Sequence, residues 1–220
     1  MQNLKSLLRD LSQPISNFKN VFFPSIAAGI LIGIAAHTFS QYALLGSIEK
    51  ILVAILFSGA LCSIKFLKLN LFTGAIGYLN RENVKTDLSK VLIILFGNLF
   101  GTFLVSAFCL SQESVQILSS KISYDALFPF LLLTFGKSIL CGILMYAAVE
   151  IFERQSLAGI LMMVPMFLLA GFEHSIANSF YLFNAILMGY TPGMISILIF
   201  CVWVLGNSIG SILFRKITRK

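Results

Sequence analysis

The chain has 220 residues, of which 58% are hydrophobic and only 11% are charged. A soluble globular domain carries roughly 25% charged and about 45–50% apolar residues, so this composition excludes a soluble enzyme. The formal net charge is +7. The positions of the basic residues relative to a bilayer have to be known before this charge can indicate a binding partner.

The first 20 residues predict an amphipathic helix in the membrane interface. Four leucines, from Leu4 to Leu11, recur at i, i+3, i+4 and i+7, and charged residues lie between them. We expect Pro14 to end this helix, and we assign residues 1–20 to the cytoplasmic face of the membrane.

Six apolar stretches follow, and two of them are too long for a straight span. They run about Val21–Leu45, Ile51–Asn80, Val91–Leu110, Ala126–Val149, Leu157–Leu187 and Met194–Phe214. The second and fifth would be about 45 Å long as helices, whereas the hydrocarbon core is about 30 Å thick. Both carry polar residues near their centres, so we expect them to break in mid-membrane, where protein or a water-lined cavity covers the freed backbone.

The two halves of the chain share short motifs in the same order. Gly29-Ile30-Leu31 matches Gly142-Ile143-Leu144, and Gly97-Asn98 matches Gly206-Asn207. Three spans per half place the halves in opposite orientations, as in many transporters. The sequence therefore predicts an all-α membrane protein of six transmembrane helices in two inverted three-helix repeats. The expected parts are a channel domain at 21–215, with repeats at about 21–110 and 126–215, and a cytoplasmic tail at 216–220.

Basic residues are distributed unevenly between the two sides of the predicted spans. Eleven of the sixteen lie on the side of the N-terminus, two lie on the other side (Lys50 and Lys121), and three lie within the membrane (Lys65, Lys68 and Lys137). The positive-inside rule then puts both termini in the cytoplasm, with the protein in the cell's inner membrane. The basic excess reflects this orientation and does not indicate nucleic-acid binding.

His174 is the strongest candidate for chemistry. It lies near mid-bilayer if the fifth span breaks at Gly171, and histidine exchanges a proton near neutral pH. The alternative is a packed histidine with satisfied hydrogen bonds. For the neighbouring Glu173 we expect a structural role, in which it accepts from backbone N–H groups or pairs with a lysine.

Deep lysines would make a pathway electropositive, which attracts anions. Lys137 lies about 16 Å into the fourth span, too deep for its side chain to reach the interface easily. Lys65 and Lys68 share one helix face, and one of these two is expected to pair with Glu173.

Several other residues near the breaks have expected roles. The Thr73 hydroxyl caps the second half of the broken helix or donates to an anion. Leu71 and Phe72 are candidates for an apolar constriction. Three asparagines are assigned first to structural support of the opened backbone: Asn98, Asn178 and Asn207.

Motifs for other function classes are missing from the sequence. It has no phosphate-binding loop, no dinucleotide fingerprint and no Ser-His-Asp pattern, and its four cysteines lack metal-ligand spacing. We therefore expect no cofactor, no metal site, no enzymatic activity and no ATP-driven transport.

The motifs together resemble one known family. "LFTG" at 71–74, "FGK" at 135–137, "GFEHSIAN" at 171–178 and the paired "GN" at 97–98 and 206–207 are similar to the formate/nitrite transporter family over roughly residues 20–215. The resemblance implies a homopentamer of aquaporin-like protomers, each with its own pore. Family members pass formate, nitrite, hydrosulfide, lactate or similar small monovalent anions.

The resemblance also implies roles for single residues. His174 would be the central pore histidine, and Thr73 the threonine of a gating loop flanked by the constriction residues Leu71 and Phe72. Lys137 would attract anions, and Asn207 would face the pore. The family often has a glutamate before "LFT"; this chain has Asn70 there and Lys68 two residues earlier, which makes the path more positive.

We therefore expect a channel for a small weak-acid anion, most simply formate, with hydrosulfide or nitrite as alternatives. Lys137, together with Lys68, would concentrate the anion, and His174 would supply or relay a proton so that no bare anion crosses the apolar region. Two other classes stay open: a channel for neutral solutes such as water, ammonia or urea, and a membrane scaffold without a continuous pore.

Overall fold

The apolar stretches fold into helices throughout the computed structural model, which describes residues 2–79, 84–122, 127–190 and 193–218. The α-helices are α1 (Gln2–Ala43), α2 (Ser47–Phe66), α3 (Phe72–Ala75), α4 (Val84–Phe108), α5 (Gln112–Ser120), α6 (Leu127–Glu153), α7 (Ala158–Leu169), α8 (Ser175–Leu187) and α9 (Met194–Thr218), and the short 3₁₀ helix η1 (Ile76–Tyr78) follows α3. No strand occurs within these described ranges, so the all-helical prediction is confirmed.

Most of these helices are long and apolar enough to cross a bilayer. Five qualify within the described residues: Phe18–Ala43, Ser47–Phe66, Thr86–Phe108, Leu127–Glu153 and Met194–Thr218. The fifth predicted stretch is divided into α7 and α8, of 12 and 13 residues. Each of these is only about 18–20 Å long, so a single one does not cross a hydrocarbon core of about 30 Å. The chain is a multi-pass membrane protein.

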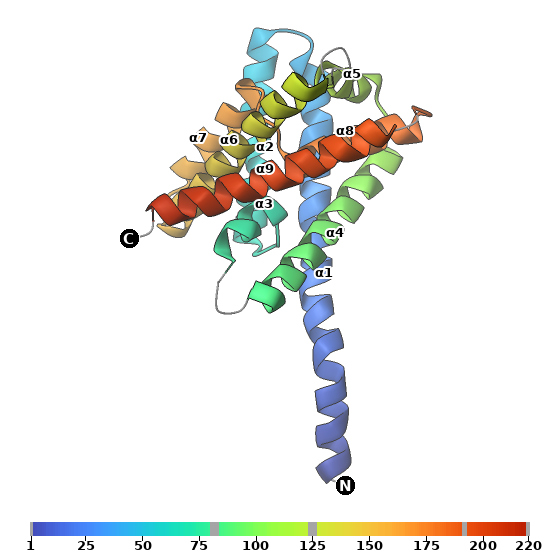
Figure 1. The fold of residues 1–220 in the computed structure, drawn as a ribbon, viewed down its shortest axis with the longest axis vertical. Coiled ribbons are helices and arrows are strands. Elements are labelled where there is room, and N and C mark those ends of the chain that lie inside the picture. The colour runs from blue at the N-terminus through green and yellow to red at the C-terminus, as the bar shows by residue number, and fades with distance from the viewer. Residues whose placement is uncertain (1, 80–83, 123–126, 191–192, 219–220) are drawn as a thin grey trace.

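The first helix is longer than expected. α1 runs without interruption from Gln2 to Ala43, and its first half extends past the bundle (Figure 1). The prediction that Pro14 ends a separate helix is wrong: an interior proline usually kinks or ends a helix, but α1 stays helical on both sides of Pro14. Side chains before Phe18 lie outside the description, so the interfacial position of residues 1–20 stays a prediction.

The helix pairs α1–α4 and α6–α9 make the most extensive contacts in the fold. In the first pair, a side chain at Gly29 would overlap the backbone carbonyl of Asn98, and in the second, one at Gly142 would overlap the carbonyl of Asn207. Glycine is therefore required at both positions for the backbones to approach this closely. The sequence motifs shared by the two halves thus correspond to the same helix contact made twice.

α5 lies between the third and fourth predicted stretches and was not predicted. Ser111 begins it by accepting a hydrogen bond from the Ser114 backbone N–H at 3.1 Å. The backbone N–H of Ser111 also donates to Asn184 Oδ1 at 2.9 Å, which attaches the start of α5 to α8. This short helix covers one end of the bundle (Figure 1).

Both predicted interruptions are present, at residues 67–71 and 170–174. The two are built alike: the Leu69 backbone N–H donates to Ile64 O at 2.8 Å, and that of Phe172 donates to Phe167 O at 2.9 Å. Such a hydrogen bond at a helix end requires a left-handed residue just before its donor. Gly171 fills that place in the second interruption (φ 68°), whereas a lysine fills it in the first, Lys68 (φ 54°).

Replacing Lys68 by glycine is expected to stabilise the protein. A side chain in the left-handed region costs roughly 1 kcal/mol that glycine does not, so Lys68→Gly should raise the unfolding temperature measured in detergent. The matched change Gly171→Lys should lower it. A lower unfolding temperature for Lys68→Gly would show that the lysine side chain stabilises this turn.

Candidate functional site

Each interruption ends at the N-cap residue of the helix that follows it. Leu71 precedes α3 and His174 precedes α8, both with extended backbone (φ −108°, ψ 129° and φ −95°, ψ 112°). Leu71 makes no side-chain capping bond, whereas His174 Nδ1 accepts from the backbone N–H of Ala177 at 3.1 Å. The histidine is therefore the N-cap of α8 as well as a residue of the interruption.

The cap fixes which nitrogen of His174 carries the proton. Because Nδ1 accepts from Ala177, the neutral ring is protonated on Nε2, which lies 3.1 Å from Thr73 Oγ1 and can donate to it. Thr73 is in the first turn of α3, and both side chains are buried. This hydrogen bond joins the two interrupted spans, and Phe167 stacks on the other side of the ring at 5.4 Å between centroids.

Asn98 of α4 holds the first interruption. Its Oδ1 accepts from the backbone N–H of Phe72 at 2.8 Å, and its Nδ2 donates to the carbonyls of Asn70 (2.8 Å) and Ser25 (2.7 Å). The side chain is completely buried. It therefore pairs backbone groups of the break that lipid could not pair.

Asn207 of α9 does the same at the second interruption. Its Oδ1 accepts from the Ser175 backbone N–H at 2.8 Å, and its Nδ2 donates to the carbonyls of Glu173 (2.7 Å) and Ser138 (2.8 Å). Both N–H groups of the Asn207 amide donate to backbone carbonyls, and the side chain is buried. The amide therefore has no free donor for a solute. Asn207 thus supports the backbone with the same kinds of bonds as Asn98, and the pore-facing role that the resemblance implied stays a prediction.

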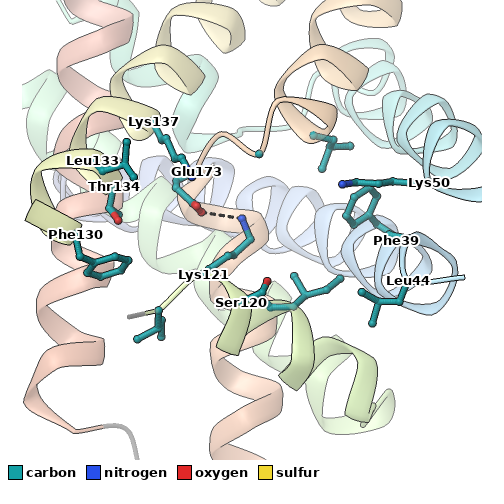
Figure 2. A pocket seen from close by; sticks show the side chains of 15 residues that line it. Phe39, Leu44, Lys50, Ser120, Lys121, Phe130, Leu133, Thr134, Lys137 and Glu173 are labelled. Atoms are coloured by element: carbon teal, nitrogen blue, oxygen red, sulfur yellow. Dashed lines mark hydrogen bonds and ion pairs between the residues drawn. The ribbon is translucent and has the colours of Figure 1, made fainter. Parts of the chain in front are cut away.

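A cavity of about 370 Å³ opens beside the second interruption (Figure 2), and we call it the lysine cavity. Its lining includes Lys50, Lys121, Lys137 and Glu173. The Glu173 carboxylate is only 5% exposed and accepts from Lys121 Nζ at 2.9 Å and from Asn178 Nδ2 at 2.7 Å. Within the described part of the chain, Lys137 makes neither a hydrogen bond nor an ion pair.

A second cavity, of about 500 Å³, lies beside the first interruption, and we call it the glutamate cavity. Its lining includes Leu71, Lys65, Glu150 and Glu153. Lys65 forms an ion pair with Glu153, and the Tyr78 hydroxyl donates to Glu150 at 2.9 Å. The two cavities therefore differ in charge, since lysines dominate one and carboxylates the other.

A buried layer separates the two cavities. Glu173 lines one and Leu71 lines the other, while His174, which is 2% exposed, lines neither. Leu71 and Phe72 are also buried, and their role as a constriction stays a prediction. Side chains around the His174 ring must move before a solute can reach it from either cavity.

Three expectations about contacts are wrong. Thr73 does not cap α3, because Asn98 accepts from that helix end and the threonine bonds to His174 instead. Neither Lys65 nor Lys68 pairs with Glu173; Lys121 does. Lys68 itself is exposed and is absent from the lining of both cavities, because the left-handed turn sets it on the surface.

Lys121 is the site residue that sequence reasoning missed. We placed it in an outer loop, but it ends α5, and its ammonium reaches a carboxylate 52 positions away. The sequence contains one signal for this element. A serine N-cap followed by a glutamate in the first turn, here Ser111 and Glu113, is typical of a helix N-terminus and predicts a helix at this position. The partner of Lys121 could not have been found that way.

Comparisons with known proteins agree on one family. The model of the family described as Formate/nitrite transporter matches residues 9–219. A solved structure of a pentameric formate channel with formate bound is 22% identical, with a TM-score of 0.71 over 92% of this chain and 94% of that one. A solved FNT family ion channel is 20% identical, with a TM-score of 0.77 over 95% of this chain and 92% of that one. No curated protein matches the chain.

Replacing Asn207 by alanine should destabilise the fold strongly. The change leaves the buried Ser175 N–H and the Glu173 carbonyl without the partners that Asn207 provides, at about 1–3 kcal/mol each, so the unfolding temperature in detergent should fall markedly. Asn98→Ala should have a similar effect, because its bonds are equivalent. Asn178→Ala, which removes one side-chain bond, is the milder control, and an Asn207→Ala protein as stable as this control would contradict the supporting role.

Proposed function

Since the chain belongs to the formate/nitrite transporter family, we propose that it is a channel for small monovalent weak-acid anions, with formate as the first candidate. Nitrite and hydrosulfide are the alternatives within the same chemistry. We further propose a homopentamer in the inner membrane with both termini in the cytoplasm, which is the orientation that the uneven distribution of basic residues favours.

The observation that carries the proposal is the position of His174. Its ring lies between two cavities, is held by hydrogen bonds at both nitrogens, and connects the two interrupted spans through Thr73. An ionisable ring so deep in a membrane protein is costly unless it serves the pathway. The lysine cavity beside it carries more positive than negative side chains, which suits an anion.

The mechanism has two stages. The ammonium of Lys137 first holds the anion in the lysine cavity, where it lowers the free energy of a charge leaving bulk water. The anion then meets the Nε2–H of His174, which donates a hydrogen bond to it. The proton that Nε2 passes to the anion is replaced in the same step by a proton from solution that reaches Nε2 through the Thr73 hydroxyl, so the ring stays neutral and Nδ1 keeps its bond to Ala177. The Thr73 hydroxyl, which can both donate and accept, keeps this nitrogen hydrogen-bonded before and after the transfer.

Protonation matters because of the apolar layer that follows. Leu71 and Phe72 offer no hydrogen bond from their side chains, so a bare anion would lose its hydration without replacement. The neutral acid passes at a much lower cost. The anion of a weak acid, which can take up a proton at the histidine, can therefore cross a constriction that excludes chloride.

His174→Phe should abolish proton-linked formate uptake into liposomes. The change removes the proton relay, and general acid–base groups contribute about 10²–10⁴-fold to rates, so a loss of at least about 100-fold is expected. Uptake is measured as formate-driven swelling together with the internal pH. Urea uptake under the same conditions shows whether the protein instead admits neutral solutes.

His174→Asn is the matched control for the helix cap. Asparagine is a good N-cap and should keep α8 folded, but it cannot exchange a proton. We expect this variant to keep the helix cap and to be more stable than His174→Phe, although it loses the bond to Thr73, and to be as inactive as His174→Phe. Full proton-linked uptake by His174→Asn would disprove the relay.

Lys137→Met should weaken anion recruitment without blocking the pore. Loss of one positive charge from the lysine cavity should raise the formate concentration for half-maximal flux by about tenfold, with a much smaller change in the maximal flux. The measurement is the initial rate of uptake against formate concentration. An unchanged half-saturating concentration would remove Lys137 from the pathway.

A further inference from the structure

We propose that Lys121 is a positioning residue which neutralises Glu173 and thereby leaves Lys137 free to bind the anion. This inference rests on the proposed anion channel and goes beyond it, because it assigns a role to a residue on α5, outside the predicted spans. The function of the ion pair would be to prevent a different pair, between Glu173 and Lys137.

The first step concerns the demand of Glu173 for a positive partner. Its carboxylate is almost fully buried, and a buried charge without a countercharge is strongly unfavourable. Asn178 supplies one hydrogen bond at 2.7 Å but no charge. A cation must therefore pair with Glu173, and the residue that does so loses much of its attraction for other anions.

The second step concerns the cations that are available. The lining of the lysine cavity contains three ammonium groups, on Lys50, Lys121 and Lys137, and one carboxylate, that of Glu173. Figure 2 shows the ion pair between Lys121 and Glu173, with Lys137 lining the same cavity from α6. Three ammonium groups thus line the same cavity as the carboxylate, and the one that pairs with it is that of Lys121, which follows α5.

The third step concerns what holds Lys121 in place. Lys121 is the C-cap residue that directly follows α5, and its backbone N–H donates to Leu118 O at 2.9 Å. Ser111 at the other end of α5 is attached to α8 through Asn184 at 2.9 Å. Because Glu173 directly precedes His174, the N-cap of α8, the helix that carries the cation is attached to the helix that follows the carboxylate.

As a consequence, Lys121 and Lys137 have different roles. Lys121 is committed to Glu173, so the positive charge on Lys137 is available to a permeating anion. Without Lys121, the carboxylate would recruit the remaining ammonium on α6. Anion recruitment would then fail although Lys137 is still present.

The test compares substitutions in reconstituted liposomes, with formate as the probe. Lys121→Met should raise the formate concentration for half-maximal flux by about tenfold, as Lys137→Met does. Lys121→Arg should retain the wild-type value, because it keeps the charge. The double variant Lys121→Met with Glu173→Gln should also return to it, since the glutamine still accepts from Asn178 but no longer competes for Lys137.

Lys50→Met is the matched control for total charge. It removes the same charge from the same cavity but leaves the ion pair intact, so we expect a change of at most about twofold. If Lys50→Met and Lys121→Met have equal effects, only the summed charge matters and the positioning role is wrong. A wild-type value for Lys121→Met, or no rescue in the double variant, would also overturn the proposal.

The outcome for the wild-type protein separates this inference from the proposed function. If wild-type liposomes take up no formate, nitrite or hydrosulfide, the anion channel itself fails. If wild-type liposomes do take them up and Lys121→Met behaves like wild type, only the role of Lys121 fails. The unfolding temperature of each variant shows that a lost flux is not a lost fold.

Discussion

A helix that stops inside an apolar layer exposes backbone N–H and C=O groups that lipid cannot hydrogen-bond. The whole site depends on which protein groups bond to them instead. Asn98 and Asn207 provide these bonds. Each accepts from the backbone N–H at the start of the second half-helix and donates to two carbonyls. Four of these six bonds attach each interruption to a continuous helix of the same half, and the bonds to the Ser25 and Ser138 carbonyls attach that helix to its neighbour. Without them the chain could not place an extended segment in mid-membrane.

The interruptions in turn make His174 useful. A residue inside an uninterrupted helix has its backbone fully bonded, whereas an N-cap sits at a helix end with its side chain near unpaired N–H groups. His174 uses one nitrogen for this cap, and the other is hydrogen-bonded to Thr73 of the first interrupted span. Structural support and proposed chemistry are thus combined in one ring. The equivalent position in the other half is Leu71, which has no polar atom, so the two halves share a backbone design but not a chemical role.

The charges around this centre are arranged unequally. Lysines line the cavity beside His174, while on the other side of the buried layer Lys65 is paired with Glu153 and Glu150 bonds to Tyr78. An anion is therefore attracted strongly from one side and less so from the other. Such an arrangement favours entry into the lysine cavity without requiring a permanent binding site beyond the constriction.

Local properties of the chain were sufficient to predict the helical membrane fold, both interruptions and the position of His174 at the second of them. Hydropathy over some twenty residues reports burial in lipid, and a stretch too long for the bilayer with polar residues at its centre has few ways to fold. The partners of the polar side chains followed from no local pattern. Thr73 meets His174 across 101 positions, and Lys121 meets Glu173 across 52, because α5 docks on α8. Pairing of this kind depends on the relative placement of whole helices, which is set by packing between distant residues and leaves no periodic trace in the sequence.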